Sequence, residues 1–239
     1  MMVDSKPQTS SPVILALDTD DLDTAIKWIE ATQDSIDIYK VGLEFFLKFG
    51  ITGLKQLRAG RKFELFLDLK LHDIPNTVAG AVTSVRVLAP RFLTVHASGG
   101  SKMVQAASNA APNIEIAAVT VLTSLDDAEL SNMGINSSPL NFAIALADNS
   151  VSAGARAIVC SPLEVKAIRA AVGNHVTLIT PGVRPADSEL ADQSRVMLPR
   201  DAMAAGANFL VIGRPITSYF AKSAQAMSER ANQIVESLS

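Results

Sequence analysis

Two aspartates and a lysine are closely spaced in segment 65–77, Leu-Phe-Leu-Asp-Leu-Lys-Leu-His-Asp-Ile-Pro-Asn-Thr. On an extended strand Asp68 and Lys70 point to one face, about 6–7 Å apart. Asp73 follows, and Pro75 suits the first turn of a helix. Nearby carboxylates favour the charged form of an ammonium group. This spacing therefore predicts that the Lys70 ammonium group, an acid, is held beside the Asp68 carboxylate, a base. The alternative interpretation is a strand-end ion pair followed by a helix cap.

Two short segments have the composition of phosphate-binding loops. Gly182 and Arg184 follow one apolar run, and Gly213 and Arg214 follow the last one. Glycine lets a ligand approach the backbone closely, and arginine donates charge-assisted hydrogen bonds to phosphate oxygens. The alternative is ordinary turn chemistry from glycine and proline, which an arginine in each segment makes less attractive.

The elements that must position these groups alternate regularly along the chain. Short apolar runs, expected as strands, cover residues 13–18, 37–41, 64–69, 92–96, 114–121, 157–160, 176–180 and 209–213. Between them lie alanine-rich amphipathic segments, including 22–32, 77–88, 140–153, 162–172 and 201–205. Alternating strands and helices with short links predict an α/β fold, a single (β/α)8 TIM barrel. An open, doubly wound sheet is the structural alternative.

Polar side chains occur at the end of seven of the eight expected strands, where the active sites of barrels form. They are Asp18, Lys40, Asp68 with Lys70, His96, Thr123, Arg184 and Arg214. Each has an ordinary explanation, such as a helix cap for Asp18 or a tight turn for His96. Because they would all lie at one rim, they predict an active site there. The glycine–arginine segments follow strands seven and eight, where barrels commonly bind phosphate, so we expect a phosphate site in these loops.

Composition limits the class of protein. Of 239 residues, 48% are apolar and 19% charged, enough for one large core, so we expect a disordered tail over 1–11 and one catalytic domain over 12–239. The net charge of −3, without a basic run, gives nucleic-acid binding no support. No apolar run reaches the 18 residues of a membrane span. The single cysteine, Cys160, is expected to be buried and indicates a reducing, cytoplasmic location.

The sequence resembles the orotidine 5'-phosphate decarboxylase family. The segments that carry the resemblance, in family order, are 15–18, 39–44, 66–77, 94–97, 180–184 and 211–217. The Asp-x-Lys-x-x-Asp pattern, with its His-Asp-Ile-Pro-Asn-Thr continuation from His72 to Thr77, is the most specific of them. The arrangement is closer to the bacterial, monofunctional branch than to the longer eukaryotic fusions.

The resemblance implies a lyase that converts orotidine 5'-monophosphate to UMP and CO₂ in pyrimidine biosynthesis, without cofactor or metal. Lys70 would stabilise the carbanion and protonate C6, within a charge network that includes Lys40, Asp68 and Asp73. The substrate-binding residues that it implies are Asp18, Lys40, Asp68, Ile74, Thr77, Thr123, Pro181, Arg184, Gln193, Gly213 and Arg214. The protein would be a homodimer in which Asp73, Ile74 and Thr77 reach into the neighbouring subunit's site.

Two other functions compete with this one. A Mg²⁺-dependent sugar-phosphate decarboxylase or aldolase on the same barrel would use Glu44 and Asp68 as metal ligands, but the long continuation of the motif argues against it. A non-catalytic nucleotide-binding protein would be expected to lack Lys70 or Asp68, and both are present. The three histidines show no paired ligand spacing, so a metal site has little support.

Overall fold

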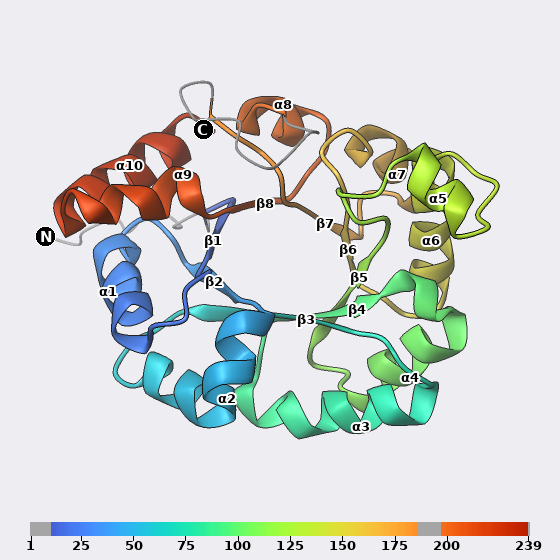
Figure 1. Cartoon of the computed structure of the whole chain (residues 1–239), viewed down its shortest axis with the longest axis horizontal. Coiled ribbons are helices and arrows are strands. Elements are labelled where there is room, and N and C mark those ends of the chain that lie inside the picture. The colour runs from blue at the N-terminus through green and yellow to red at the C-terminus, as the bar shows by residue number, and fades with distance from the viewer. Residues whose placement is uncertain (1–10, 186–196, 239) are drawn as a thin grey trace, which may run out of the picture.

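A computed structural model describes residues 11–185 and 197–238. Eight parallel strands form a closed barrel in sequence order, because β8 pairs with β1 (Figure 1). They are β1 Val13–Ala16, β2 Ile38–Val41, β3 Glu64–Leu71, β4 Phe92–His96, β5 Glu115–Val119, β6 Ala157–Val159, β7 Thr177–Thr180 and β8 Phe209–Ile212. The predicted (β/α)8 barrel is confirmed, and the open-sheet alternative is wrong.

Helices surround the barrel in the order expected for strand–helix units (Figure 1). They are α1 Leu22–Thr32, α2 Leu43–Arg58, α3 Pro75–Val85, α4 Ser101–Ala110, α5 Asp127–Asn132, α6 Pro139–Ser152, α7 Val165–Val172, α8 Pro199–Ala204, α9 Arg214–Thr217 and α10 Ala224–Glu236. Short 3₁₀ turns follow as η1 Arg86–Leu88, η2 Ala97–Gly99 and η3 Ser218–Ala221. Helix α1 has the predicted bounds, and its first turn is capped by Asp21, whose carboxylate accepts the Thr24 N–H.

Most predicted strands are one or two residues longer than the observed ones, whereas β3 is longer than predicted and continues to Leu71. Of the polar strand-end residues, Lys40, Asp68, Lys70 and His96 lie on strands, whereas Asp18, Thr123 and Arg184 lie in loops and Arg214 begins α9. The connection between β5 and α6 contains the short helix α5. None of the helices in the two described ranges is both long and apolar enough to cross a membrane.

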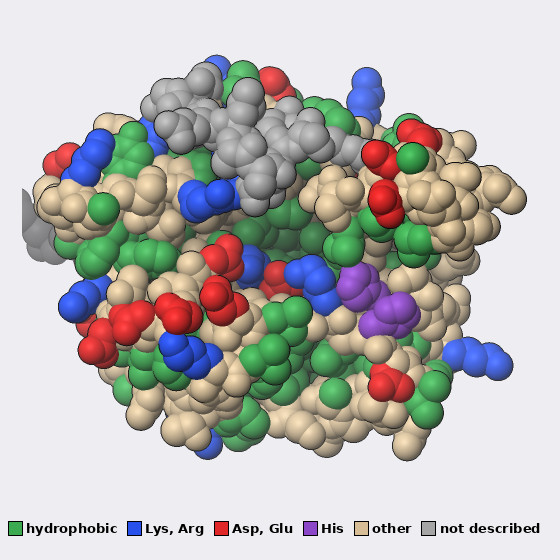
Figure 2. Space-filling model, in the orientation of Figure 1, with side chains coloured by type: hydrophobic (Ala, Val, Ile, Leu, Met, Phe, Trp, Pro, Cys, Tyr) green, Lys and Arg blue, Asp and Glu red, His purple; other side chains and the backbone are tan. Residues whose placement is uncertain are grey.

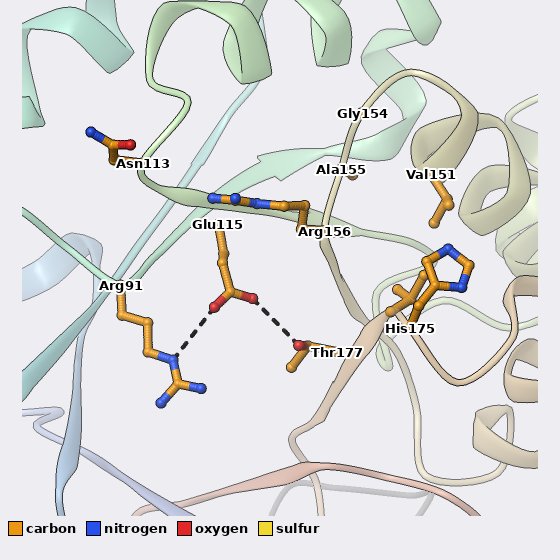
Figure 3. A pocket seen from close by; sticks show the side chains of 10 residues that line it. Arg91, Asn113, Glu115, Val151, Gly154, Ala155, Arg156, His175 and Thr177 are labelled. Atoms are coloured by element: carbon orange, nitrogen blue, oxygen red, sulfur yellow. Dashed lines mark hydrogen bonds and ion pairs between the residues drawn. The ribbon is translucent and has the colours of Figure 1, made fainter.

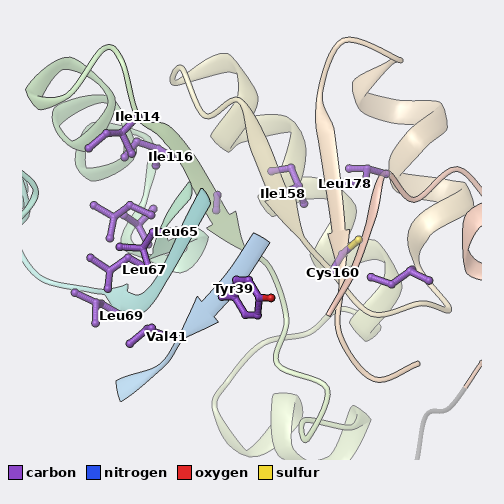
Figure 4. Packing of buried hydrophobic residues seen from close by; sticks show 14 of the residues in the cluster. Tyr39, Val41, Leu65, Leu67, Leu69, Ile114, Ile116, Ile158, Cys160 and Leu178 are labelled. Atoms are coloured by element: carbon purple, nitrogen blue, oxygen red, sulfur yellow. The ribbon is translucent and has the colours of Figure 1, made fainter. Parts of the chain in front are cut away.

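Side-chain alternation divides the core into two layers. On β3, Leu65, Leu67 and Leu69 pack outward against the helices, as Figure 4 shows. Phe66 points into the barrel, where its ring contacts that of Phe92 with centroids 5.7 Å apart. This alternation also places Asp68 on the interior face, so the predicted orientation of the strand holds.

Cys160 lies in the outer layer and is fully buried (Figure 4). Burial, with a smaller contribution from Glu164, raises the pKa of its thiol to about 12. A thiol that stays protonated is a poor nucleophile, so Cys160 acts as a small core residue, as expected.

Candidate active site

Four charged side chains, from β2, β3 and the loop after β1, form one continuous chain of ion pairs at the C-terminal rim. The Nζ of Lys40 lies 3.0 Å from Oδ1 of Asp18 and 3.5 Å from Oδ2 of Asp68. The Nζ of Lys70 donates to both oxygens of Asp68, at 2.8 and 2.9 Å. Each acid therefore has a lysine next to it, and Asp68 is held between two.

The centre of this chain is withdrawn from water. The side chains of Lys40 and Asp68 are each 11% exposed, and that of Lys70 is 30% exposed. Burial alone would raise the pKa of Asp68, but Lys40 and Lys70 outweigh it, so this pKa is lowered. Burial likewise opposes the charge on Lys40, and Asp68 and Asp18 reverse the effect, so its pKa is raised. The site is thus an array of oppositely charged side chains in mutual contact, an arrangement suited to electrostatic stabilisation of charge.

The backbone that carries Lys70 is irregular. The pairing of β3 with β4 changes register between Leu67 and Leu71. Within this interval Lys70 has φ 47°, in the left-handed region that residues with a side chain seldom occupy. Backbone strain of this kind is typical of a functional position, and here it occurs at a lysine that belongs to the chain of ion pairs.

A cavity of about 190 Å³ adjoins the charge chain. Figure 2 shows basic and acidic side chains gathered around a hollow on this face. The cavity is lined by Lys40, Phe66, Asp68, Lys70, Val119, Val121, Leu122, Thr123, Val159, Cys160, Ser161, Pro181 and Val211. Charged groups therefore meet an apolar floor in one cavity, a combination common in small-molecule sites.

The sequence indicated Thr123 and Pro181 but missed the apolar floor. Phe66, Val119 and Val211 come from barrel strands and point inward. Side chains alternate between the two faces of a strand, but a strand that is buried on both faces is apolar throughout. The sequence therefore does not show which of its apolar residues point inward. Only the closed barrel shows which apolar side chains face the ligand and which face the helices.

The two predicted phosphate segments lie after β7 and β8. Gly182 has φ 79°, a conformation that glycine adopts without strain. A Cβ on Gly213 would stand 3.7 Å from an oxygen of Asp18, so this loop reaches the charge chain. Arg184 is buried and its guanidinium donates to the Val183 carbonyl at 3.1 Å, whereas Arg214 is exposed. Gln193 lies outside the described residues.

The segment after β3 is exposed and, among the described residues, makes no ion pair with the charge chain. Asp73, Ile74 and Thr77 are all exposed, and the side chain of Asp73 accepts the N–H of Ile74 at 2.6 Å. Ile74, an apolar residue, is 67% exposed. Within the described part of one subunit, no ion pair joins Asp73 to Lys70, so the structure does not bring these two predicted residues together.

A histidine pair flanks the site. The rings of His72 and His96 have centroids 5.4 Å apart. Burial, followed by the charges of His72 and Lys70, lowers the pKa of His96. Residues 11–185 and 197–238 contain no group of three His, Cys, Asp or Glu side chains that could hold a metal ion. The alternative ligand Glu44 is exposed in the first turn of α2, and both oxygens of Asp68 already contact ammonium groups.

A second cavity, of about 580 Å³, lies at the opposite end of the barrel, where strands begin (Figure 3). Its carboxylate, Glu115, is already engaged: Oε1 lies 3.6 Å from Arg91, and Oε2 accepts from Thr177 at 3.3 Å. Although this cavity is larger, the one carboxylate among the described residues that line it is already paired, and none of these lining residues is a lysine. The smaller C-terminal cavity is therefore the candidate active site, in agreement with the usual location in barrels.

Comparison with known proteins agrees with this geometry. A sequence model of the orotidine 5'-phosphate decarboxylase / HUMPS family matches residues 11–228. The chain is 55% identical over 208 residues to an orotidine 5'-phosphate decarboxylase of Thermobifida fusca, covering 87% of this chain and 89% of that protein. For one of Frankia casuarinae the identity is 47% over 228 residues, with 88% and 83% coverage.

Solved structures show the same likeness. The crystal structure of an orotidine 5'-phosphate decarboxylase from Lactobacillus acidophilus superposes with a TM-score of 0.80 at 34% identity, covering 95% of this chain and 99% of that one. Fold, charge chain and sequence similarity lead to the same conclusion. The chain belongs to the orotidine 5'-phosphate decarboxylase / HUMPS family.

Proposed function

We propose that this protein is a carboxy-lyase that converts orotidine 5'-monophosphate to UMP and CO₂ in pyrimidine biosynthesis. The observation that carries the proposal is the ammonium group of Lys70, held 2.8 and 2.9 Å from the two oxygens of a largely buried Asp68 beside an apolar cavity. Family membership supports the same reaction.

The chemical problem is the electron pair left behind by CO₂. When the bond between C6 and the carboxylate breaks, both electrons stay on C6, and the pyrimidine ring offers no obvious sink for them. A fixed ammonium group stabilises this charge as it develops, with little reorganisation. Lys70 then donates a proton to C6 to form the C–H bond of UMP, and solvent restores the proton to Lys70. No cofactor is needed in this scheme.

The other site residues bind and orient the nucleotide. Asp18 and Lys40, 3.0 Å apart, would hold the ribose hydroxyls, because together they offer an acceptor and a donor. Thr123 and Pro181, in the cavity wall, would contact the pyrimidine. The phosphate would bind to the residues after β7 and β8, which are Arg184, Gln193, Gly213 and Arg214.

We further propose that the active protein is a homodimer with shared sites. The exposure of Asp73, Ile74 and Thr77 supports this arrangement, because a partner subunit would cover Ile74 and supply Asp73 to the neighbouring Lys70. An exposed apolar side chain between two polar groups is a common feature of an interface. The proposed location is the cytoplasm, where the unpaired Cys160 would remain reduced.

The first test follows the ultraviolet absorbance of orotidine 5'-monophosphate after addition of enzyme, with EDTA present. Conversion to UMP is expected, and EDTA should not slow it. Absence of conversion by folded protein would contradict the proposal. Activity that appears only after Mg²⁺ is added, or on sugar phosphates instead, would favour the metal-dependent alternative with Glu44 and Asp68 as ligands.

The shared site is tested by mixing two inactive variants, Lys70→Ala and Asp73→Asn. If Asp73 acts across the interface, random reassortment makes half the dimers mixed, each with one complete site, so about a quarter of wild-type activity returns. If Asp73 acts within its own chain, no mixed dimer has a complete site and activity stays absent. Mixing each variant with itself provides the control.

A further inference from the structure

Thr94 on β4 contacts both halves of the central acid–lysine pair. Its side chain is fully buried. The Oγ1 accepts the backbone N–H of Lys70 at 2.8 Å and donates to Oδ1 of Asp68 at 3.0 Å. One hydroxyl thus bonds to the backbone that carries the proposed proton donor and to the carboxylate that the donor faces.

The irregular backbone explains why this contact matters. Leu67 pairs with Leu93, and the next pairing is Leu71 with Val95, so Thr94 stands opposite three residues of β3. The regular ladder is interrupted there, and the N–H of Lys70 is bonded to the Thr94 hydroxyl instead. The same hydrogen bond holds the left-handed conformation of Lys70 in place.

The carboxylate of Asp68 is fixed by the same contact. Its Oδ1 accepts from Lys70 and Thr94, and its Oδ2 faces Lys70 and Lys40. Contacts on both oxygens prevent the carboxylate from rotating. Without the hydroxyl, only the two flexible lysine side chains would define its orientation.

We propose that Thr94 is a positioning residue for the decarboxylation, because its hydroxyl sets the backbone angle of Lys70 and the orientation of Asp68. The inference rests on the proposed role of Lys70. Thr94 does not line the cavity, so it acts through its two partners. It should therefore affect the chemical step far more than binding of the nucleotide.

The test compares three variants. Thr94→Val keeps the shape of the side chain and removes the hydroxyl, whereas Thr94→Ser keeps the hydroxyl. The control is Thr120→Val, because Thr120 is similarly buried and its hydroxyl donates to the Val159 carbonyl at 3.2 Å rather than to a member of the charge chain. All three are measured for kcat, KM, UMP affinity and thermal stability.

A misplacement of about 1 Å costs on the order of 10²-fold in rate. We therefore expect kcat of Thr94→Val to fall about 10- to 100-fold, with UMP affinity within about threefold of wild type. Thr94→Ser should recover most of the rate, and Thr120→Val should retain wild-type kcat. A purely structural role would lower stability in Thr94→Val without this split between kcat and affinity.

The pH profile gives an independent readout. The hydrogen bond from Thr94 is one of the contacts that lower the pKa of Asp68, together with the charges of Lys40 and Lys70. The other titratable groups nearby are Asp18, which pairs with Lys40, and His96, which stands beside His72. Loss of the bond raises the pKa of Asp68, so the acid limb of kcat should move to higher pH in Thr94→Val and return in Thr94→Ser.

Wild-type kcat in folded Thr94→Val would overturn the inference. So would a Thr94→Ser enzyme as slow as Thr94→Val at equal stability. If Thr94→Val does not fold, the comparison of Thr94→Ala with Thr94→Ser decides in the same way. Failure here is separable from failure of the proposed function, because wild type would still decarboxylate the nucleotide and Lys70→Ala would still be inactive.

Discussion

The two ends of the barrel both carry charge networks, but they are built differently. At the N-terminal end Arg91 is paired with Glu64 and Glu115, and its guanidinium stacks on the rings of Phe92 and Phe209. All five residues lie on or next to regular strand starts. At the C-terminal end the two central members of the charge chain, Lys40 and Asp68, are more deeply buried, and the chain depends on an interrupted strand pairing.

This difference indicates that one network contributes to stability and the other to function. Paired charges on regular backbone cost little to assemble, and at a partly exposed rim they contribute modestly to the free energy of unfolding. A lysine with φ 47° has an unfavourable backbone that surrounding contacts must hold in place. We infer that the N-terminal network stabilises the fold, whereas the C-terminal network is kept in a strained conformation because the reaction requires it.

The largest expected effect is the loss of catalytic activity when the C-terminal network loses its lysine. In Lys70→Ala, kcat should fall by at least about 10³-fold, because both the charge that stabilises the carbanion and the proton donor are lost. Affinity for UMP, measured by calorimetry, should remain within about tenfold. A variant with ordinary turnover would show that the C-terminal network does not perform the reaction.

The second effect concerns the remote part of the substrate. Arg214→Ala should lower kcat/KM about 10²- to 10³-fold and should also lower kcat, because phosphate binding energy is used in the chemical step. Steady-state kinetics with orotidine 5'-monophosphate measure both values. A raised KM with unchanged kcat would mean that the loop after β8 contributes only uniform binding.

The third effect is confined to the N-terminal end. Arg91→Met should lower the free energy of unfolding by about 1–2 kcal/mol, since Glu64 and Glu115 lose their partner and two rings lose a cation. Its kcat should be unchanged. Lys48→Met is the control: it removes an exposed pair with Asp20, and we expect less than about 0.5 kcal/mol. Urea unfolding measures both, and a loss of kcat in Arg91→Met would contradict the separation of the two ends.

The smallest effect is a pH dependence of stability. The pKa of Asp68 is lowered in the folded protein, so its ionised form contributes stability above its unfolded pKa, about 3.9, and loses it as pH falls through the folded value. As the pH falls from about 5 to 3, wild type should therefore lose stability relative to Asp68→Asn. The quantity to measure is the difference between their free energies of unfolding. A difference that is constant over this range would show that Asp68 gains nothing from its lysines on folding.

The sequence predicted much of the site because its strongest signals are local. Alternation along β3 placed Asp68 on the interior face with Lys70 beside it, and the structure joins them at 2.8 Å. Alternating apolar and amphipathic segments predicted the closed barrel. Strand ends were less accurate, because a polar residue after an apolar run looks the same whether or not its backbone still pairs.

What the sequence by itself determined is the repeated strand–helix pattern, the family and the identity of the charged residues at the rim, since these depend on residue order and short-range periodicity. Only the tertiary structure decided that Lys70 is left-handed, that Thr94 bonds to it and to Asp68, and that Asp73 stays apart from Lys70 of its own subunit. The physical reason is register: these contacts depend on one shifted pairing between β3 and β4, and no local pattern in the sequence specifies that shift.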